Sequence, residues 1–297
     1  MVWVTVAALA GGCNGAVRNT QRVRPGSVPP AKEATATELI AAYNRAAQSI
    51  KSLNVIVELK PTAGSVYSGL IEEYHEVQGF ILADRPASIR VIGQAPVVGK
   101  NIFDMVSDGQ TFRIFIPSKH KFIVGPAALE RATKNPIENL RPQHLLDALF
   151  WPDIAPKQTV LFEEFNDEAG RYYILTVLRS GEPPEIARRI WFNRADLQVT
   201  RIEVFASGGK LLADIRYGDW EAVAPANVAA GEAGEASSTT FFPRQIVLAR
   251  PRDDYRLDIQ VLKLQLNGPI GAERFHLEQP PGSDLVKLEE NDEGNER

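Results

Sequence analysis

Residues 79–117 read GFILADRPASIRVIGQAPVVGKNIFDMVSDGQTFRIFIP, and their pattern sets the class of fold. Short apolar runs alternate with Gly, Asp, Asn and Pro, which predicts strands over 79–92, 99–107 and 110–117. The connections between these strands are too short to hold a helical crossover. Successive strands are therefore expected to pair as an antiparallel meander.

The same pattern continues on both sides of this stretch. Further strands are predicted over 54–60, 66–77, 120–125, 158–166, 171–179, 186–194, 198–206, 210–219, 240–249 and 254–266. Two helices interrupt the series. Thr35 and Glu38 have capping-box spacing before an apolar stripe that runs from Leu39 to Leu53, and Pro142 suits the first turn of a short helix that ends near Phe150.

Many of these strands are apolar on both faces. RYYILTVL, residues 171–178, places aromatic or aliphatic side chains on each side of the sheet. A sheet with one solvated face would alternate more cleanly, so an apolar layer is expected on each face, as in a curved sheet with helices packed into its concave side. In the last strand the apolar phase changes at Val261–Leu262, which predicts a β-bulge there.

The order of short motifs in the opening stretch resembles the LolA/LolB superfamily, the periplasmic lipoprotein-localisation carriers and their outer-membrane receptors. The matching residues are Gly79, Arg85-Pro86, Ile89-Arg90, Ser107-Asp108-Gly109, Phe112 and Pro117. FHLEQPPGSDLV, residues 275–286, is similar to the final strand of the family followed by its Pro-Gly. The resemblance covers about half of the chain, and its weight comes from the order of the motifs.

The resemblance implies a mostly β fold: a strongly curved antiparallel half-barrel of about 11–13 strands, with helices over the concave face and an apolar cavity for acyl chains. In the soluble carriers the arginine of the RP motif holds the lid helix shut, and Arg85 matches it. The alternative is that Arg85 only marks a strand edge before a proline. In the receptor an exposed leucine on a loop touches the membrane. The matching loop here is 94–99, with Val97 and Val98 at its tip in place of the leucine.

Large apolar residues in the predicted strands and after the second helix are candidates to line the cavity, although each could equally belong to an ordinary core. The candidates are Phe80, Leu82, Ile89, Val91, Phe112, Phe115, Phe122, Trp151, Trp191, Phe192 and Trp220. An acyl chain needs only a dry apolar pocket, because each buried methylene contributes about 0.8 kcal/mol. No cofactor or metal is expected.

The single cysteine, Cys13, follows the apolar run MVWVTVAALAGG, which has the form of a secretory signal peptide. Residues 9–13, LAGGC, resemble the bacterial lipobox, although the leucine stands one place further from the cysteine than usual and no basic residue precedes the run. The resemblance implies that Cys13 carries the lipid that anchors the mature protein. The alternative is a buried N-terminal strand with an incidental cysteine.

The expected organisation is a signal peptide at 1–12, a lipidated cysteine with a flexible tether at 13–34, a half-barrel domain at 35–282 and an acidic tail at 283–297. Residues 221–239 are rich in Ala, Gly and Glu and are expected to form a flexible insertion. Residues 284–297 carry a net charge of −4, equal to that of the whole chain. The remaining body is close to neutral, which excludes an electrostatic footprint for nucleic acid.

Recognised catalytic patterns are not found in the sequence. The four histidines lie in separate segments without a metal-binding spacing, and SGGK at 207–210 fits a hairpin turn better than a phosphate loop. His144 and Asp147 stand three residues apart on the second predicted helix, where a surface polar pair is favoured over a metal site. The protein is therefore expected not to be an enzyme.

The sequence thus predicts a lipid-anchored envelope protein that binds acyl chains of lipids or lipoproteins and acts in their transport or insertion. Asn14 follows the cysteine, and in the enteric-type sorting system a residue other than aspartate there sends a lipoprotein to the outer membrane, on its periplasmic side. Two alternatives stay open. One is a scaffold with a filled barrel that binds an envelope protein, and the other is a hydrolase or transferase that uses His144 on a lipid.

Overall fold

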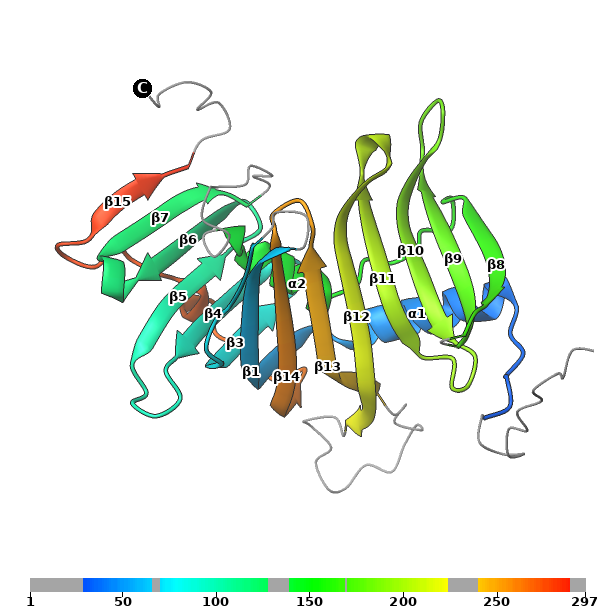
Figure 1. Cartoon of the computed structure of the whole chain (residues 1–297), viewed down its shortest axis with the longest axis horizontal. Coiled ribbons are helices and arrows are strands. Elements are labelled where there is room, and N and C mark those ends of the chain that lie inside the picture. Colours follow the sequence, from blue (N-terminus) through cyan, green and yellow to red (C-terminus); the bar gives the residue numbers. More distant parts are fainter. Residues whose placement is uncertain (1–28, 66–69, 128–138, 169, 224–239, 289–297) are drawn as a thin grey trace, which may run out of the picture.

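The computed structural model describes residues 29–65, 70–127, 139–168, 170–223 and 240–288. Within these ranges the chain forms one sheet of fifteen strands and two α-helices, α1 (Ala36–Ser49) and α2 (Pro142–Leu149) (Figure 1). The strands are β1 (Ser52–Ser65), β2 (Leu70–Glu73), β3 (Val77–Asp84), β4 (Ser88–Gln94), β5 (Asn101–Ser107), β6 (Thr111–Ile116), β7 (Lys121–Pro126), β8 (Val160–Asn166), β9 (Arg171–Arg179), β10 (Glu185–Asn193), β11 (Val199–Ala206), β12 (Lys210–Val223), β13 (Thr240–Arg250), β14 (Tyr255–Leu266) and β15 (Asp284–Lys287).

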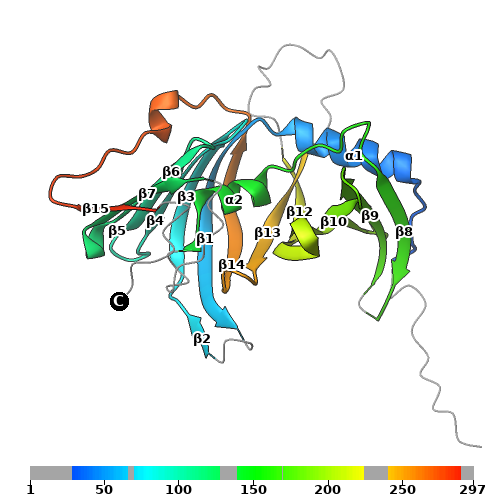
Figure 2. The same ribbon diagram turned by 90° about the horizontal axis from the view of Figure 1, so that it is seen from above.

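The sheet is open, with β15 at one edge and β8 at the other. Its order is β15-β7-β6-β5-β4-β3-β1-β14-β13-β12-β11-β10-β9-β8, and the short β2 pairs with β1 beside this path. All pairs are antiparallel except β15 with β7, which is parallel. The strongly curved half-barrel that the sequence predicted is confirmed, with more strands than expected (Figures 1 and 2).

Two features account for the additional strands. The stretch 79–92, predicted as one strand, is a hairpin of β3 and β4, because Pro86 lies in a turn that Asp84 and Ser88 close by pairing. A proline has no N–H for the ladder, which suits a turn. The second addition is β15, which follows the Pro-Gly turn. The resemblance implied a final strand before that turn, but residues 276–280 form no strand and follow a 3-10 helix, Ala272–Phe275.

Both predicted helices are present with their predicted starts. At α1 the backbone N–H of Thr35 donates to Glu38 Oε2 over 2.8 Å, and the N–H of Glu38 donates to Thr35 Oγ1 over 3.3 Å, which completes the capping box. Helix α2 begins at Pro142, whose missing N–H would have had no partner in the first turn. The helices pack on the concave face, α1 alongside β8–β13 and α2 near the middle of the sheet (Figure 2).

The predicted bulge is confirmed in β14. Ile56 of β1 pairs with Lys263 and the next residue, Val57, pairs with Val261, so that Leu262 is the extra residue. Leu262 is 44% exposed, whereas Val261 and Leu266 on either side of it are buried. The extra residue therefore lets both apolar phases of β14 face the same core.

The domain is longer at both ends than the sequence indicated. Residues 29–34, expected in the tether, contact the sheet: Pro29 accepts a bond from Arg171 of β9, and Glu33 accepts one from Tyr173 of the same strand. Residues 221–223 continue β12 and pair with β13, so they are not part of a flexible insertion. β15 lies inside the expected acidic tail. The expected signal peptide, Cys13 and residues 224–239 lie outside the described residues.

Candidate functional site

An apolar cavity of about 410 Å³ lies where β1, β3, β5, β6, β7 and β14 meet. Helix α1 runs along the other part of the sheet, beside β8–β13 (Figure 1). The cavity is lined by residues of β1, β3, β5, β6, β7 and β14 and of the segments that flank them: Pro61, Thr62, Ala63, Tyr74, His75, Glu76, Val77, Ala95, Pro96, Ile102, Phe103, Met105, Ile114, Ile116, Ile123, Leu140, Tyr255, Arg256 and Leu257. Nearly all of the lining is carbon. A pocket of this size and character suits an apolar ligand.

The strand register explains why this lining is apolar. Met105 of β5 pairs with Ile114 of β6, which pairs with Ile123 of β7, so the three side chains stand in a row on one face. Alternate residues of each strand point to the same side. The row therefore continues the buried concave face into the cavity.

A tight loop between β4 and β5 stands at the edge of the cavity. Ala95 and Pro96 line the cavity, while Val97 is 96% exposed and Val98 is 73% exposed. The N–H of Gly99, at a φ of +60°, donates to the carbonyl oxygen of Ala95 over 3.0 Å and closes the loop. Two apolar side chains are thus held in solvent beside an apolar cavity, and membrane contact by this loop stays a prediction.

None of the eleven residues predicted to line an apolar cavity lies among the residues that line this one. Four of them lie on the opposite, convex face, since they alternate with lining residues along their strands: Phe80 and Leu82 in β3, Phe115 in β6 and Phe122 in β7. Trp191 also lies apart from the cavity, in a cluster with Phe165 and Tyr172. The sequence gives the phase of each strand but not which phase faces inward.

The other six candidates are concave-face residues that the helices and their flanking segments cover. Ile89, Val91 and Phe112 are fully buried, and the guanidinium of Arg141 lies 4.9 Å from the centre of the Phe112 ring. The remaining three, Trp151, Phe192 and Trp220, line a second cavity of about 330 Å³ beside α1. The main cavity is lined instead by residues that include Met105, Ile114 and Ile123. In the sequence these three are marked only by the alternation of apolar residues along their strands.

Arg85 joins both helical segments to the sheet. Its Nε donates to the carbonyl oxygen of Ile50 over 2.9 Å, and its Nη2 donates to the carbonyl oxygens of Ala47 over 2.8 Å and Trp151 over 3.1 Å. Ala47 and Ile50 end α1, where carbonyls lack helical partners. These contacts are those that a lid-holding arginine would make, and the lid function itself remains a prediction.

His144 and Asp147 of α2 do not form the predicted surface pair. His144 Nδ1 lies 2.6 Å from the hydroxyl of Tyr255, and burial, followed by the charges of Arg250 and Arg141, holds the pKa of His144 well below its usual value. Asp147 accepts a bond from Gln143. Asp147 is exposed on α2, yet desolvation by the neighbouring protein raises the pKa of its carboxyl.

The described residues contain no group of three His, Cys, Asp or Glu side chains that could hold a metal ion. Within the same residues no helix is both long and apolar enough to cross a membrane.

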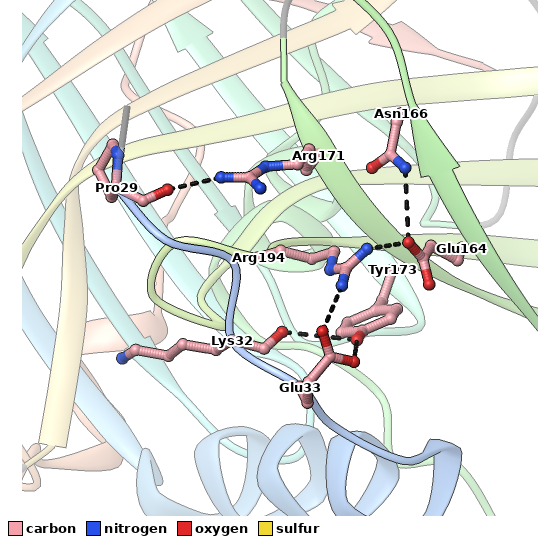
Figure 3. Close-up of polar contacts among 8 residues, drawn as sticks. All are labelled: Pro29, Lys32, Glu33, Glu164, Asn166, Arg171, Tyr173 and Arg194. Atoms are coloured by element: carbon pink, nitrogen blue, oxygen red, sulfur yellow. Dashed lines mark hydrogen bonds and ion pairs between the residues drawn. The ribbon is translucent and has the colours of Figure 1, made fainter. Parts of the chain in front are cut away.

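The segment before α1 is fixed to β8, β9 and β10 at the far end of the sheet from β15 (Figure 3). Arg194 donates to Glu33 Oε1 over 2.7 Å and forms an ion pair with Glu164, while the hydroxyl of Tyr173 donates to Glu33 Oε2 over 3.0 Å. Arg171 donates to the carbonyl oxygen of Pro29 over 2.6 Å. Pro29, the first described residue, therefore lies at this end of the sheet.

No protein-family model and no curated protein match this sequence. Among solved structures, a DUF1329 family protein from Desulfovibrio piger is similar with a TM-score of 0.50 and 11% identity, over 80% of this chain and 94% of that chain. A LolA superfamily protein from Nitrosomonas europaea has a TM-score of 0.47 and 13% identity, over 82% and 99%. A domain named for outer membrane lipoprotein sorting, from Vibrio parahaemolyticus, has a TM-score of 0.49 and 8% identity, over 80% and 94%.

Likeness at such identities concerns the fold alone. The architecture described above is the one that the sequence resemblance implied: an open, curved antiparallel sheet with helices on its concave face and an apolar cavity beside them. The chain therefore has the curved, open-sheet fold that the resemblance implied, and it shares that fold with the DUF1329 family protein.

Proposed function

We propose that this protein binds an acyl chain of a lipid or lipoprotein in the cavity lined by Met105, Ile114 and Ile123, and acts in lipid or lipoprotein transport or insertion in the cell envelope. The observation that carries this proposal is the cavity itself, an apolar space of about 410 Å³ in a sheet whose neighbouring concave surface is closed by helices. Binding is non-covalent, and no residue takes part in a chemical step.

The free energy available to such a ligand is large. Each methylene that leaves water contributes about 0.8 kcal/mol, so ten methylenes contribute about 8 kcal/mol before the cost of ordering the chain. Ligand pockets commonly measure roughly 300–1,000 Å³, so this cavity accommodates at least part of one acyl chain. In this proposal the lipid on Cys13 keeps the domain beside the outer membrane, facing the periplasm.

Two neighbouring residues of β6 provide a matched test. Ile114 lines the cavity, whereas Phe115 lies on the opposite face and is half-buried. We expect Ile114→Trp to narrow the cavity and to weaken uptake of a fluorescent fatty acid by the full chain. Phe115→Trp is the control and retains uptake.

Native mass spectrometry after expression in an envelope compartment identifies the natural ligand of both variants and the original chain. Circular dichroism confirms that each variant is folded. Acyl binding in this cavity is excluded if the two variants take up the fatty acid equally. It is also excluded if the folded original chain carries no lipid and takes up none that is added.

The exposed loop gives a second test of the same function. In a Cys13→Ser background, which removes the lipid anchor, Val97→Glu/Val98→Glu is expected to weaken co-flotation with liposomes. Leu161→Glu, a change at a residue 51% exposed on β8, is the control. Unchanged flotation of the loop variant excludes membrane contact by this loop.

A second candidate function is that of a scaffold for an envelope protein. It is favoured by β8, the edge strand of the sheet, where Leu161, Phe162 and Phe165 are all more than one-third exposed. An edge strand with exposed apolar side chains suits pairing with another chain. A folded chain that takes up no lipid would favour this function over the carrier.

A lipid-acting enzyme would require His144, and unchanged activity of His144→Ala on any identified substrate excludes it.

A further inference from the structure

A third pocket, which is basic, lies between the β11–β12 turn and the β13–β14 turn. Its volume is about 570 Å³. Four cationic side chains and one carboxylate stand among its described lining residues: Arg179, Lys210, Arg250, Arg252 and Asp253. Val204, Phe205 and Leu212 supply apolar walls. The pocket therefore combines an excess of positive charge with a partly apolar floor.

Two of the four cations are satisfied within the protein. Arg250 forms an ion pair with Asp253, and Arg179 donates to the carbonyl oxygen of Phe205 over 3.0 Å and to Glu185 over 3.5 Å. Lys210 and Arg252 are exposed, and within the described residues neither side chain makes a hydrogen bond or an ion pair. Two cations are thus available to a ligand beside a fixed Arg250–Asp253 pair.

The turn between β13 and β14 separates this pocket from the apolar cavity. Arg250, Arg252 and Asp253 line the basic pocket, and Tyr255 and its two successors line the cavity. Neighbouring strands are about 4.8 Å apart, so the step from β12 across β13 to β14 is about 10 Å. The charge of Arg250 acts on His144, which bonds Tyr255 of the cavity wall. Arg250 pairs with Tyr255 across this turn, so the two pockets adjoin at this end of the sheet.

We propose that the basic pocket binds the phosphate of an anionic lipid headgroup while the acyl chain of the same molecule occupies the apolar cavity. This inference rests on the proposed function and deepens it. It names as the ligand a lipid that carries a phosphate headgroup as well as an acyl chain, rather than a neutral lipid. Arginine and lysine donate charge-assisted hydrogen bonds to phosphate oxygens, and these bonds are stronger than those to neutral groups. Lys210 and Arg252 make the new contacts.

The test compares dodecyl phosphate with dodecanol, which has the same chain and no charge. The full chain is expected to bind dodecyl phosphate at least about tenfold more tightly, a preference that isothermal titration calorimetry measures. Lys210→Glu/Arg252→Glu is expected to bring the ratio of the two affinities to about one. The matched control, Lys51→Glu/Lys263→Glu, reverses two exposed charges outside both pockets and keeps the preference.

The outcomes separate this inference from the function beneath it. If dodecanol and dodecyl phosphate bind equally well to the original chain, the headgroup site is excluded and acyl binding stands. If neither binds, both proposals fail. Inorganic phosphate that binds as tightly as dodecyl phosphate identifies a free phosphate as the ligand and overturns the lipid assignment. Equal loss of preference in the control variant overturns the assignment to Lys210 and Arg252.

Discussion

Arg85 Nη2 lies 2.8 Å from the carbonyl oxygen of Ala47, so the turn between β3 and β4 is bonded to the last turn of α1. The same nitrogen reaches the carbonyl oxygen of Trp151, just after α2. One side chain thus joins the ends of both helices to the sheet. The guanidinium therefore bonds both helical segments where they lie over the concave face.

Arg85→Leu is expected to destabilise the domain by about 2–4 kcal/mol, because three carbonyl oxygens lose a charged donor. In a thermal unfolding experiment the change lowers Tm by about 5–10 °C. Arg85→Lys recovers only part of this loss, since an ammonium cannot reproduce the planar fork. Arg45→Leu, at an exposed position of α1, serves as the control. If Arg85→Leu and the original chain are equally stable, these bonds make no net contribution to the free energy of unfolding.

The bulge in β14 predicts a contrast between two leucines of one strand. Leu262 is 44% exposed and Leu266 is 2% exposed. Leu262→Ser is expected to change the free energy of unfolding by less than about 0.5 kcal/mol, whereas Leu266→Ser costs about 2–4 kcal/mol. Urea denaturation of the two variants measures both values. A larger effect at Leu262 would contradict the register described here.

Buried tyrosines predict a loss of stability in alkaline solution. Burial raises the pKa of Tyr43 to about 12, and burial likewise raises the pKa of Tyr217 and Tyr255. An unfolded tyrosine loses its proton near pH 10, so the folded state holds more protons above that pH. The stabilising contribution of Tyr43 is complete below about pH 10 and is lost as the pH rises toward about 12, by roughly 2–3 kcal/mol.

Tyr43→Phe tests the share of this residue. At neutral pH the variant loses the bond from Tyr43 to the carbonyl oxygen of Pro152, about 1 kcal/mol. Above about pH 10 its free energy of unfolding should fall less steeply than that of the original chain. Urea denaturation across this pH range measures the two slopes, and identical slopes would exclude the predicted titration.

His144 predicts a loss of stability in mild acid. Its pKa in the folded state is held well below the usual value, chiefly by burial. Below about pH 6.5 the unfolded chain binds a proton that the folded state rejects, so stability falls by up to about 1.4 kcal/mol per pH unit. His144→Gln is expected to flatten the dependence between about pH 5 and 7, and His276→Gln, at an exposed residue, is expected to leave it unchanged. The opposite result would assign the acid sensitivity to another group.

Local patterns in the sequence were sufficient for several elements. The capping box of Thr35 and Glu38 and the proline at the start of α2 use bonds within one turn, so nearby residues determine them. The bulge at Leu262 follows from a change of phase inside one strand. Each of these features depends on residues a few positions apart, which a sequence displays directly.

Contacts between distant residues decided the rest. β15 pairs with β7 although more than a hundred residues separate them, and no local pattern marks that partner. The cavity needs β14 beside β1 and an uncovered part of the concave face beyond the helices. Alternation indicates which side chains of β3 and of β6 share a face, but not which face is concave. Phe80 and Phe115 were therefore as plausible as lining residues as Val77 and Ile114. The sequence by itself determined the class of fold, the helix starts and the strand phases, because these follow from local propensity and periodicity. Only the tertiary structure decided which face is concave and where that face stays empty, because curvature and helix packing arise from contacts among all the strands.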